Sequence, residues 1–250
     1  MHLPHDRLLA IERAEVAAWP ALQTADIEGW LWRYSGGGSQ RANSVSPLDF
    51  HGTDVEAAIG QAEALYRKRG AAPMFQVCHI NVPADLDERL RRRGYRLQEP
   101  CTALAKQIGS DATAGRDAEI EIGDAPGDAW LSVYLAGITP NRRDLAPMIL
   151  ERVPGPRAFV LLRHQGQPAA TALGVVAHGV VVAECVSTRA DLRRIGGASR
   201  VMLALEAWGA RQGATIAALQ AVSANTPAQG LYAKLDYRSV GGYHYRVLDI

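Results

Sequence analysis

Two adjacent glycines before a helix are the feature that most constrains this chain. The segment Arg193–Ala198, RRIGGA, follows an apolar run that ends at Thr188 and precedes Ser199–Gln212, which has helical periodicity. Each glycine costs a helix about 1 kcal/mol relative to alanine, so the pair indicates that bare backbone is needed there. The first helical turn offers N–H groups without intrahelical partners, and the helix dipole favours an anion beside them. The segment therefore predicts a pyrophosphate cradle, with Arg193 and Arg194 at its rim.

A second glycine-rich segment serves as a control. Arg33–Gly38, RYSGGG, satisfies the same R-x-x-G-x-G/A pattern, but it leads into Pro47 and has no apolar stripe behind it. Without a helix there is no dipole and no row of free N–H groups, so this segment predicts a hairpin turn. RRIGGA also lacks the Lys-Ser/Thr ending of a P-loop, and no G-x-G-x-x-G follows the first strand of a βαβ unit. Neither ATP nor NAD is therefore indicated.

Charge and composition exclude several classes of protein. The 27 Lys and Arg residues against 26 Asp and Glu residues, a net charge of +1, give no electrostatic argument for a nucleic-acid or membrane partner. Three cysteines without CxxC spacing and seven scattered histidines argue against a disulfide framework and against a metal site. There is no signal-peptide pattern and no run of roughly 18 apolar residues. We therefore expect a cytoplasmic protein without a metal.

A change of composition at 106–119 predicts a boundary between two domains, over 1–110 and 117–250. Periodicity predicts helices over 8–19, 53–69, 85–94, 128–138, 199–212 and 225–236. It predicts strands over 73–82, 95–108, 118–125, 159–188 (three strands), 214–222 and 237–250, with a further strand pair over 29–48. Both pieces close with strand, short helix and strand in the same order, which indicates a structural duplication.

The glycine segment and a second motif together resemble the GNAT superfamily of acyl-CoA-dependent N-acyltransferases. That family has Q/R-x-x-G-x-G/A at a helix start after its fourth strand, where backbone amides hold the CoA pyrophosphate. The segment that would do so here comprises Arg193, Arg194, Ile195, Gly196, Gly197, Ala198 and Ser199. The family often continues with Asn-x-x-Ala-x-x-Leu-Tyr-x-x-x-Gly-Phe. The matching positions here are Asn225, Ala228, Leu231 and Tyr232, while Asp236 and Tyr237 replace the Gly and Phe.

The resemblance implies an α+β fold with tandem GNAT-like units, each a central, mostly antiparallel sheet flanked by helices. The motifs cover residues 119–250, so the domain over 117–250 would bind acetyl-CoA. The domain over 1–110 would be a degenerate unit that forms a substrate wall or a structural contact, because its corresponding place around 47–61 has no glycine motif. One active site per chain is expected.

The same resemblance implies roles for individual residues. The fourth and fifth strands of the unit would diverge, and backbone groups of Val186 and Thr188 would hold the pantetheine arm of CoA. Tyr232 would give a proton to the departing sulfur, although a tyrosine at this place can also pack its helix onto the sheet. Asn225 would contact the CoA arm, or cap its helix, and the two roles are compatible.

Glu184 is the candidate general base. It interrupts the apolar strand VVVAECV, and a half-buried carboxylate is costly unless it is paired or protonated. The alternatives are a solvent-facing Glu or one paired with an arginine such as Arg163, while Cys185 is expected to be a small core residue. The acceptor would lie near residues of the first helical region of this unit, although two of them also have the spacing of a core stripe: Trp130, Tyr134, Asn141 and Arg142.

We therefore expect an enzyme that transfers acetyl from acetyl-CoA to a primary amine of a small molecule or an amino-acid-like acceptor by direct transfer. The alternatives are a non-catalytic acyl-CoA-binding or sensing module, and an acetyltransferase acting on protein N-termini or lysines. The expected partner is a small amine, without nucleic acid or membrane, and the chain would be a monomer or a homodimer.

Overall fold

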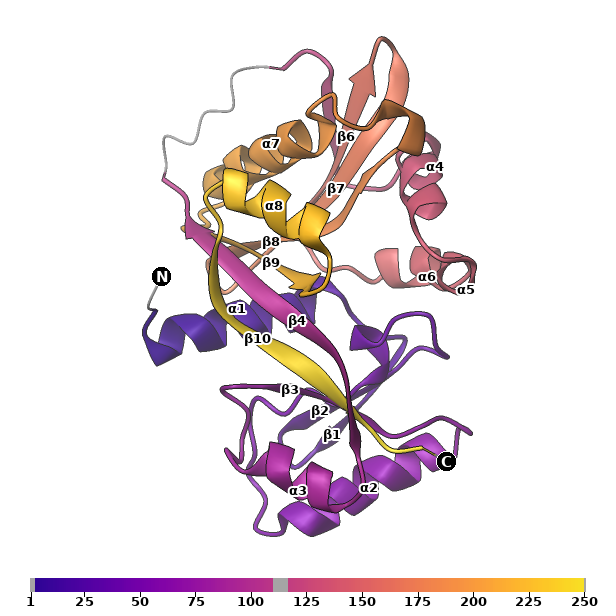
Figure 1. Cartoon of the computed structure of the whole chain (residues 1–250), viewed down its shortest axis with the longest axis vertical. Helices are drawn as coiled ribbons and strands as arrows, with labels where there is room; N and C mark the ends of the chain where they lie inside the picture. Colours follow the sequence, from indigo (N-terminus) through magenta and orange to yellow (C-terminus); the bar gives the residue numbers. More distant parts are fainter. Residues whose placement is uncertain (1–2, 110–116, 250) are drawn as a thin grey trace.

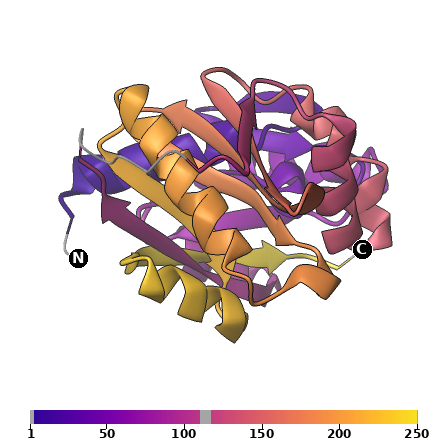
Figure 2. The ribbon, with the colours of Figure 1, turned by 90° about the horizontal axis from the view of Figure 1, so that it is seen from above.

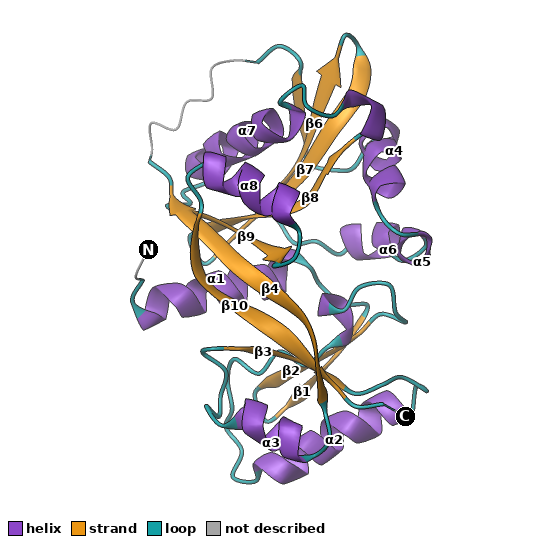
Figure 3. Cartoon of the chain, viewed as in Figure 1, coloured by secondary structure: helices purple, strands orange, loops and turns teal. Residues whose placement is uncertain are grey.

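The computed structural model describes residues 3–109 and 117–249 of the chain. Its first half contains α1 (His5–Ala18), β1 (Gln23–Ile27), β2 (Trp30–Tyr34), the 3-10 helix η1 (Arg41–Asn43), α2 (Val55–Arg67), β3 (Met74–Cys78), α3 (Leu86–Arg92) and β4 (Arg96–Gln107). Its second half contains β5 (Ile120–Gly123), α4 (Asp128–Gly137), α5 (Pro140–Arg143), α6 (Ala146–Leu150), β6 (Arg157–His164), β7 (Gln167–Ala177), β8 (Val180–Thr188), η2 (Ala190–Leu192), α7 (Gly197–Arg211), β9 (Ile216–Val222), α8 (Thr226–Lys234) and β10 (Arg238–Val247). Strands and helices occur in both halves (Figure 3).

Within the described residues, eight strands form one mixed sheet in the order β3-β10-β4-β9-β8-β7-β6-β5, and β1 pairs with β2 in a separate hairpin. Neighbouring strands are antiparallel except β8 and β9, which are parallel because the crossover helix α7 joins them. Helices flank the sheet on both faces (Figure 2). The predicted α+β class, with a mostly antiparallel sheet flanked by helices, is confirmed.

The two halves exchange their last strands. β4 ends the first half and pairs with β9 of the second, whereas β10 ends the second half and pairs with β3 of the first. β4 and β10 also pair with each other and run between the two halves (Figure 1). The units β3–α3–β4 and β9–α8–β10 therefore occupy corresponding places in the sheet, in agreement with a duplication. The domain boundary between 110 and 117 stays a prediction, because residues 110–116 lie outside the described part of the chain.

Helix α7 packs against β6, β7 and β8 with the apolar stripe expected from its periodicity. Val201, Met202 and Leu205 on this stripe are completely buried. Gly209 lets the helix approach β8 closely, since a Cβ at this position would lie 2.6 Å from Val181. This contact fixes the N-terminus of α7 relative to the strands.

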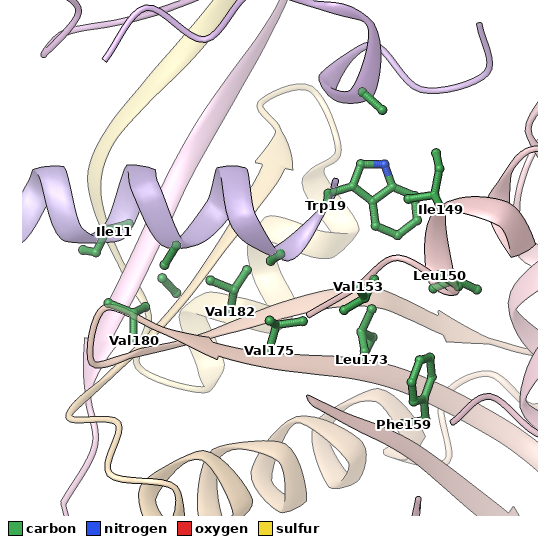
Figure 4. Close-up of a cluster of buried hydrophobic side chains, with 14 of the residues drawn as sticks. Ile11, Trp19, Ile149, Leu150, Val153, Phe159, Leu173, Val175, Val180 and Val182 are labelled. Atoms are coloured by element: carbon green, nitrogen blue, oxygen red, sulfur yellow. The ribbon is translucent and has the colours of Figure 1, made fainter. Parts of the chain in front are cut away.

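Helix α1 belongs to the first half but covers the opposite face of the second half's strands. Ile11 and Trp19 lie over a layer of valines that includes Val175 and Val182 (Figure 4). Burying an aliphatic or aromatic side chain in such a layer contributes roughly 1.5–3 kcal/mol. The first half is therefore anchored on the second by its core as well as by its strands.

Some expected elements differ in the structure. The hairpin of this region joins β1 and β2 at Glu28 and Gly29. The RYSGGG segment contains the last two residues of β2 and then continues as a wider loop that leads into η1. The loop brings the chain back beside β2, where Leu31 and Ser46 form a single antiparallel β-bridge in place of the expected second strand. The short helices α5 and α6 were not expected. In the part of the chain described here, no helix is long and apolar enough to cross a membrane.

Candidate active site

Strands β8 and β9 pair only at their beginnings. Parallel partners run from Val180–Ile216 to Val182–Ala218, after which β9 continues along β4 and β8 continues along β7. We call the divergence of β8 residues 183–188 from β9 residues 219–222 the fork. Beyond Val182, the backbone of β8 that faces the fork has no strand partner among the described residues. The divergence expected from the resemblance is therefore present in this structure.

A β-bulge re-aims β8 at the fork. Glu184 lies opposite Leu173 and Ser187 opposite Thr171, so β8 has one extra residue, and Cys185 within it has a φ of 54°. Thr171 donates its hydroxyl to the Cys185 carbonyl at 3.2 Å. Burial raises the pKa of the Cys185 thiol well above its usual range, and the charge of Glu184 raises it further. The raised pKa favours the protonated thiol, in keeping with the expected role of Cys185 as a small core residue.

The glycine segment forms the start of α7 as predicted. Gly196 is the N-cap in a left-handed conformation with a φ of 78°, and Arg194 before it has a φ of 66°. The first backbone bond of the helix joins the N–H of Arg200 to the carbonyl of Gly196 at 3.1 Å. The N–H groups at 197–199 have no acceptor within the described residues. Free N–H groups of this kind at a helix N-terminus can bind an anion.

A pocket of about 540 Å³ lies in front of these N–H groups, and we call it the cradle pocket. It extends from the end of β8 past the start of α7 to α8. Its lining residues are Thr188, Arg193, Arg194, Gly196, Gly197, Ala198, Ser199, Thr226, Pro227, Gly230, Leu231 and Lys234. A Cβ at Gly196 would meet no atom within 4 Å, so a side chain there would extend into open space. Lys234 was not expected here, since only the position of α8 brings its ammonium to the pocket.

Helix α8 begins with the second motif. Asn225 accepts the N–H of Ala228 at 3.2 Å, so its side chain caps the helix, while its predicted contact with a CoA arm stays a prediction. Tyr232 lies on the inward face of the helix and is only 7% exposed. Its ring packs edge-on against Tyr237 with centroids 5.9 Å apart. Burial raises the pKa of Tyr232 to about 12, with a further contribution from the charge of Glu184, so its hydroxyl stays protonated at ordinary pH.

Glu184 forms a bidentate ion pair with Arg41 of the first half. Arg41 donates Nη2 to Oε2 at 2.5 Å and Nη1 to Oε1, and Glu184 is 7% exposed. Burial alone would lower the pKa of Arg41, but the charge and hydrogen bonds of Glu184 raise it well above its ordinary value. Arg163 bonds to Glu121 instead. The base candidate is therefore buried and paired, with a partner from the other half of the chain.

Two more carboxylates reach this place from α1. Glu184 and Gln220 each lie two residues beyond the last β8–β9 pair, so both project on the side that α1 covers. Gln220 donates to Glu12 at 3.4 Å, and Glu15 lies 3.7 Å from Nη1 of Arg41. Sequence reasoning missed these α1 residues and Arg41 because nothing in their local pattern distinguishes them from structural charges.

A family model that describes the C-terminal part of the probable histone acetyltransferase Rv0428c matches residues 7–246. The chain belongs to this family. It is 28% identical over 256 residues to YobR of Bacillus subtilis (strain 168), described as an uncharacterized N-acetyltransferase, with 97% of this chain and 99% of YobR covered. It is 30% identical over 127 residues to Rv0428c of Mycobacterium tuberculosis (strain ATCC 25618 / H37Rv), a match of 50% of this chain and 37% of that protein.

Solved structures share the fold of this Rv0428c-family acetyltransferase. A GCN5-related N-acetyltransferase from Kribbella flavida superposes with a TM-score of 0.69 at 17% identity, covering 99% of this chain and 96% of that one. A tandem GNAT protein from the clavulanic acid biosynthesis pathway gives 0.64 at 12% identity, with 98% and 95% covered. The chain is thus an N-acetyltransferase of GNAT type, and the GNAT resemblance of the sequence is confirmed.

The residues predicted near the acceptor lie in different surroundings in this Rv0428c-family enzyme. Trp130 is 2% exposed, donates its indole N–H to the carbonyl of Ala172 at 3.2 Å and packs edge-on against Phe159. A side chain packed in this way supports the fold. Tyr134 is also buried, and burial, with the neighbouring Cys185, raises its pKa well above the usual range. Contact of either ring with an acceptor stays a prediction.

Asn141 and Arg142 lie on α5, against the glycine loop of the first half. A Cβ at Gly38 would lie 3.1 Å from the Asn141 carbonyl oxygen and 3.5 Å from Cα of Arg142. The loop that carries η1 therefore borders the same region as α5. Over 3–109 and 117–249, no three His, Cys, Asp or Glu side chains come together in a way that could hold a metal ion.

Proposed function

We propose that this acetyltransferase transfers the acetyl group of acetyl-CoA to the primary amine of a small molecule by direct transfer. The observation that carries the proposal is the fork, which has the cradle pocket and Tyr232 toward one face of the sheet and the buried Glu184 toward the other. An acyl donor held along the fork would meet an amine that approaches from the α1 side. The proposal extends the GNAT activity by naming donor and acceptor.

The cradle pocket has the chemistry that the CoA pyrophosphate requires. Free N–H groups at 197–199 and the positive end of the α7 dipole favour an anion, and the bare backbone at Gly196 lets it approach. Arg193, Arg194 and Lys234 add positive charge around the pocket. Farther along, the unpaired edge of β8, with Val186 and Thr188, offers backbone groups to the pantetheine arm.

Transfer follows from the groups at the fork. An ammonium acceptor gives one proton to Glu184, and its freed lone pair forms a bond to the acetyl carbon. A backbone N–H on the open edge of β8 polarises the thioester carbonyl. The carbon–sulfur bond then breaks, its electron pair leaves with sulfur, and Tyr232 gives sulfur a proton. The second proton that the nitrogen loses restores Tyr232, so the products are an amide, CoA thiol and one proton.

The acceptor side favours a small amine. Arg41, Glu15 and Glu184 are buried between α1, β8 and η1, with side chains at most 17% exposed. The glycine loop also packs against α5 beside this region. A slender amine can enter such a place with less rearrangement than a folded protein surface. Acetylation of a protein lysine remains the alternative outcome of the experiment.

Donor binding is tested by thermal-shift titration with acetyl-CoA, CoA and ATP. A ligand at about 100 times its Kd stabilises the folded state by about 2.7 kcal/mol, which is readily measured. We expect acetyl-CoA and CoA to stabilise the wild type and ATP to have little effect. Gly196→Glu should lose the response, whereas Gly36→Glu should keep it, because Gly36 has the same φ of 78° and open surroundings but no cradle. Equal responses of the two variants would refute the assignment.

The acceptor is tested by thiol release from acetyl-CoA with a panel of monoamines, polyamines, amino sugars and amino acids, and with a lysine-containing peptide. Turnover with a small amine and none with the peptide supports the proposal. Turnover with the peptide alone would assign a protein substrate. Thiol release with neither would contradict the proposed donor and acceptor pair.

A further inference from the structure

The pairing of Glu184 with Arg41 conflicts with a simple role as base. A proton on Glu184 would remove the negative charge that Arg41 faces at 2.5 Å. Arg41 is 17% exposed along its side chain, and a buried charge left without a partner is strongly destabilising. A proton on Glu184 therefore leaves Arg41 without an ionised partner unless another carboxylate takes the place of Glu184.

Glu15 is a carboxylate without an evident structural purpose. It lies on α1, is 3% exposed, and neither of its side-chain oxygens has a hydrogen-bond partner among the described residues. Its Oε2 lies 3.7 Å from Nη1 of Arg41, which is within ion-pair range but longer than a hydrogen bond. A carboxylate buried without hydrogen bonds costs stability, so its position calls for a function.

We propose that Glu15 is the second partner of Arg41, so that Arg41 moves from Glu184 to Glu15 when Glu184 takes the proton of the acceptor ammonium. This inference rests on the proposed function and adds a positioning residue from the first half of the chain. A small shift of the Arg41 guanidinium closes the 3.7 Å separation and opens the bond to Glu184. Arg41 then keeps an ionised partner before and after proton transfer.

The charges balance through the step. With Glu15 ionised, Arg41 lies between two carboxylates, Glu15 and Glu184, and the acceptor ammonium supplies the fourth charge. After the proton moves, Glu184 and the amine are neutral, and Arg41 is paired with Glu15. The charges of these four groups sum to zero in both states and Glu12 takes no part, so the step changes no net charge in a buried place. The arrangement selects acceptors that arrive as cations.

The charge state of Glu15 depends on the groups around it. Burial raises the pKa of Glu15 well above its ordinary value, the charges of Glu184 on β8 and Glu12 on α1 raise it further, and Arg41 on η1 lowers it. Tyr237, after α8, also interacts with its charge. Because Glu15 must be ionised to accept Arg41, transfer should increase as pH rises and Glu15 loses its proton.

A stability cycle tests the second pairing without any substrate. Glu184→Gln alone should destabilise little because Arg41 can pair with Glu15, and Glu15→Gln alone should destabilise little because Arg41 stays with Glu184. The double variant leaves Arg41 without a carboxylate, so its unfolding constant should exceed the product of the single effects by about tenfold or more.

Glu12→Gln combined with Glu184→Gln is the matched control. Glu12 is one turn from Glu15 on the same helix and similarly buried, but it forms no ion pair with Arg41 within the described residues. We expect this control to be additive within about twofold. An additive result for Glu15 and Glu184 would overturn the proposal, even if no acceptor is found.

The pH dependence of kcat/KM tests the catalytic part with an amine that the panel identifies. In wild type, kcat/KM should rise with pH, and Glu15→Gln should remove this rise and lower the plateau by about tenfold or more. The response to acetyl-CoA in the thermal-shift assay should stay unchanged. If Glu15→Gln lowers the plateau of kcat/KM but keeps the pH profile of the wild type, Glu15 has a structural role and the proposal is overturned. Failure of wild type to turn over any amine would count against the proposed function, and the stability cycle would still decide whether Glu15 partners Arg41.

Discussion

The proposed role of Tyr232 as the acid leads to a prediction that separates catalysis from stability. The hydroxyl of Tyr232 donates to no protein group within the described residues, whereas the hydroxyl of neighbouring Tyr237 donates to Glu206 at 2.9 Å. Tyr232→Phe therefore breaks no protein hydrogen bond and should change the free energy of unfolding by less than about 0.5 kcal/mol. Tyr237→Phe makes the same chemical change in the neighbouring ring, and it should lower the free energy of unfolding by about 1–3 kcal/mol because a buried hydrogen bond is lost.

The expected effects on turnover are the reverse. Loss of a positioned acid typically lowers the rate by a factor of about 100 or more, since the CoA thiolate must then leave unprotonated. A pKa of about 12 does not prevent Tyr232 from acting, because the burial that raises it also makes a nearby thiolate more basic. Its hydroxyl is therefore available across the working pH range.

The assay is thiol release at saturating acetyl-CoA, with urea unfolding measured in parallel. We expect Tyr232→Phe to lose about 100-fold in kcat with wild-type stability, and Tyr237→Phe to lose stability with nearly wild-type kcat. A decrease in kcat of less than about threefold for Tyr232→Phe would refute its role as the acid. Equal kcat losses in both variants would instead indicate a packing effect.

Three further predictions concern packing, charge and pH. Gly209→Ala should destabilise by about 1–3 kcal/mol in urea unfolding, because the new methyl would lie 2.6 Å from a valine on β8, whereas Gly60→Ala, with open surroundings in α2, should stabilise by up to about 1 kcal/mol. Lys234→Ala should raise the Kd of CoA by about three- to fivefold, and this increase should be smaller at high salt. Lys68 is exposed and lies outside the pocket, so Lys68→Ala should leave the Kd unchanged and serves as the control. The hydrogen bonds of Arg246 on β10 lower the pKa of Asp87 from 3.8 to about 2. The stability that ionised Asp87 contributes is therefore present above about pH 4 and is lost as the pH falls through about 2. The difference in unfolding free energy between wild type and Asp87→Asn should therefore shrink over that range, and a constant difference would contradict the shift.

Local patterns predicted the elements around the cradle pocket. RRIGGA predicted bare backbone at a helix start, and the structure has α7 beginning there, with Gly196 in a left-handed conformation that the pattern did not specify. The motif from Asn225 to Tyr232 predicted a short helix, which Asn225 caps. Each of these depends on residues close in sequence, where turn preferences and helix capping act directly. The apolar runs likewise predicted β6, β7 and β8.

The surroundings of Glu184, where we propose that the acceptor binds, could not be predicted in the same way. Arg41 and Glu184 are 143 residues apart, and they meet only because α1 and η1 pack against β8. Trp130 and Tyr134 are four residues apart on one helix, a spacing that fits either a pocket wall or a core stripe. Their burial becomes apparent only when β6 and β7 are packed against the helix. Long-range strand pairing, including the exchange of β4 and β10, leaves no local signal in periodicity.

One chain contributes both halves around the Arg41–Glu184 pair, so the pair is independent of dilution. Glu184 and Arg41 come from different halves, as residues from different subunits do in a shared active site, yet a peptide chain tethers them in fixed one-to-one stoichiometry. Their effective concentration is set by the fold and not by the amount of protein present. Mass action therefore cannot separate them, and specific activity should persist at dilutions where a site built between two chains would dissociate.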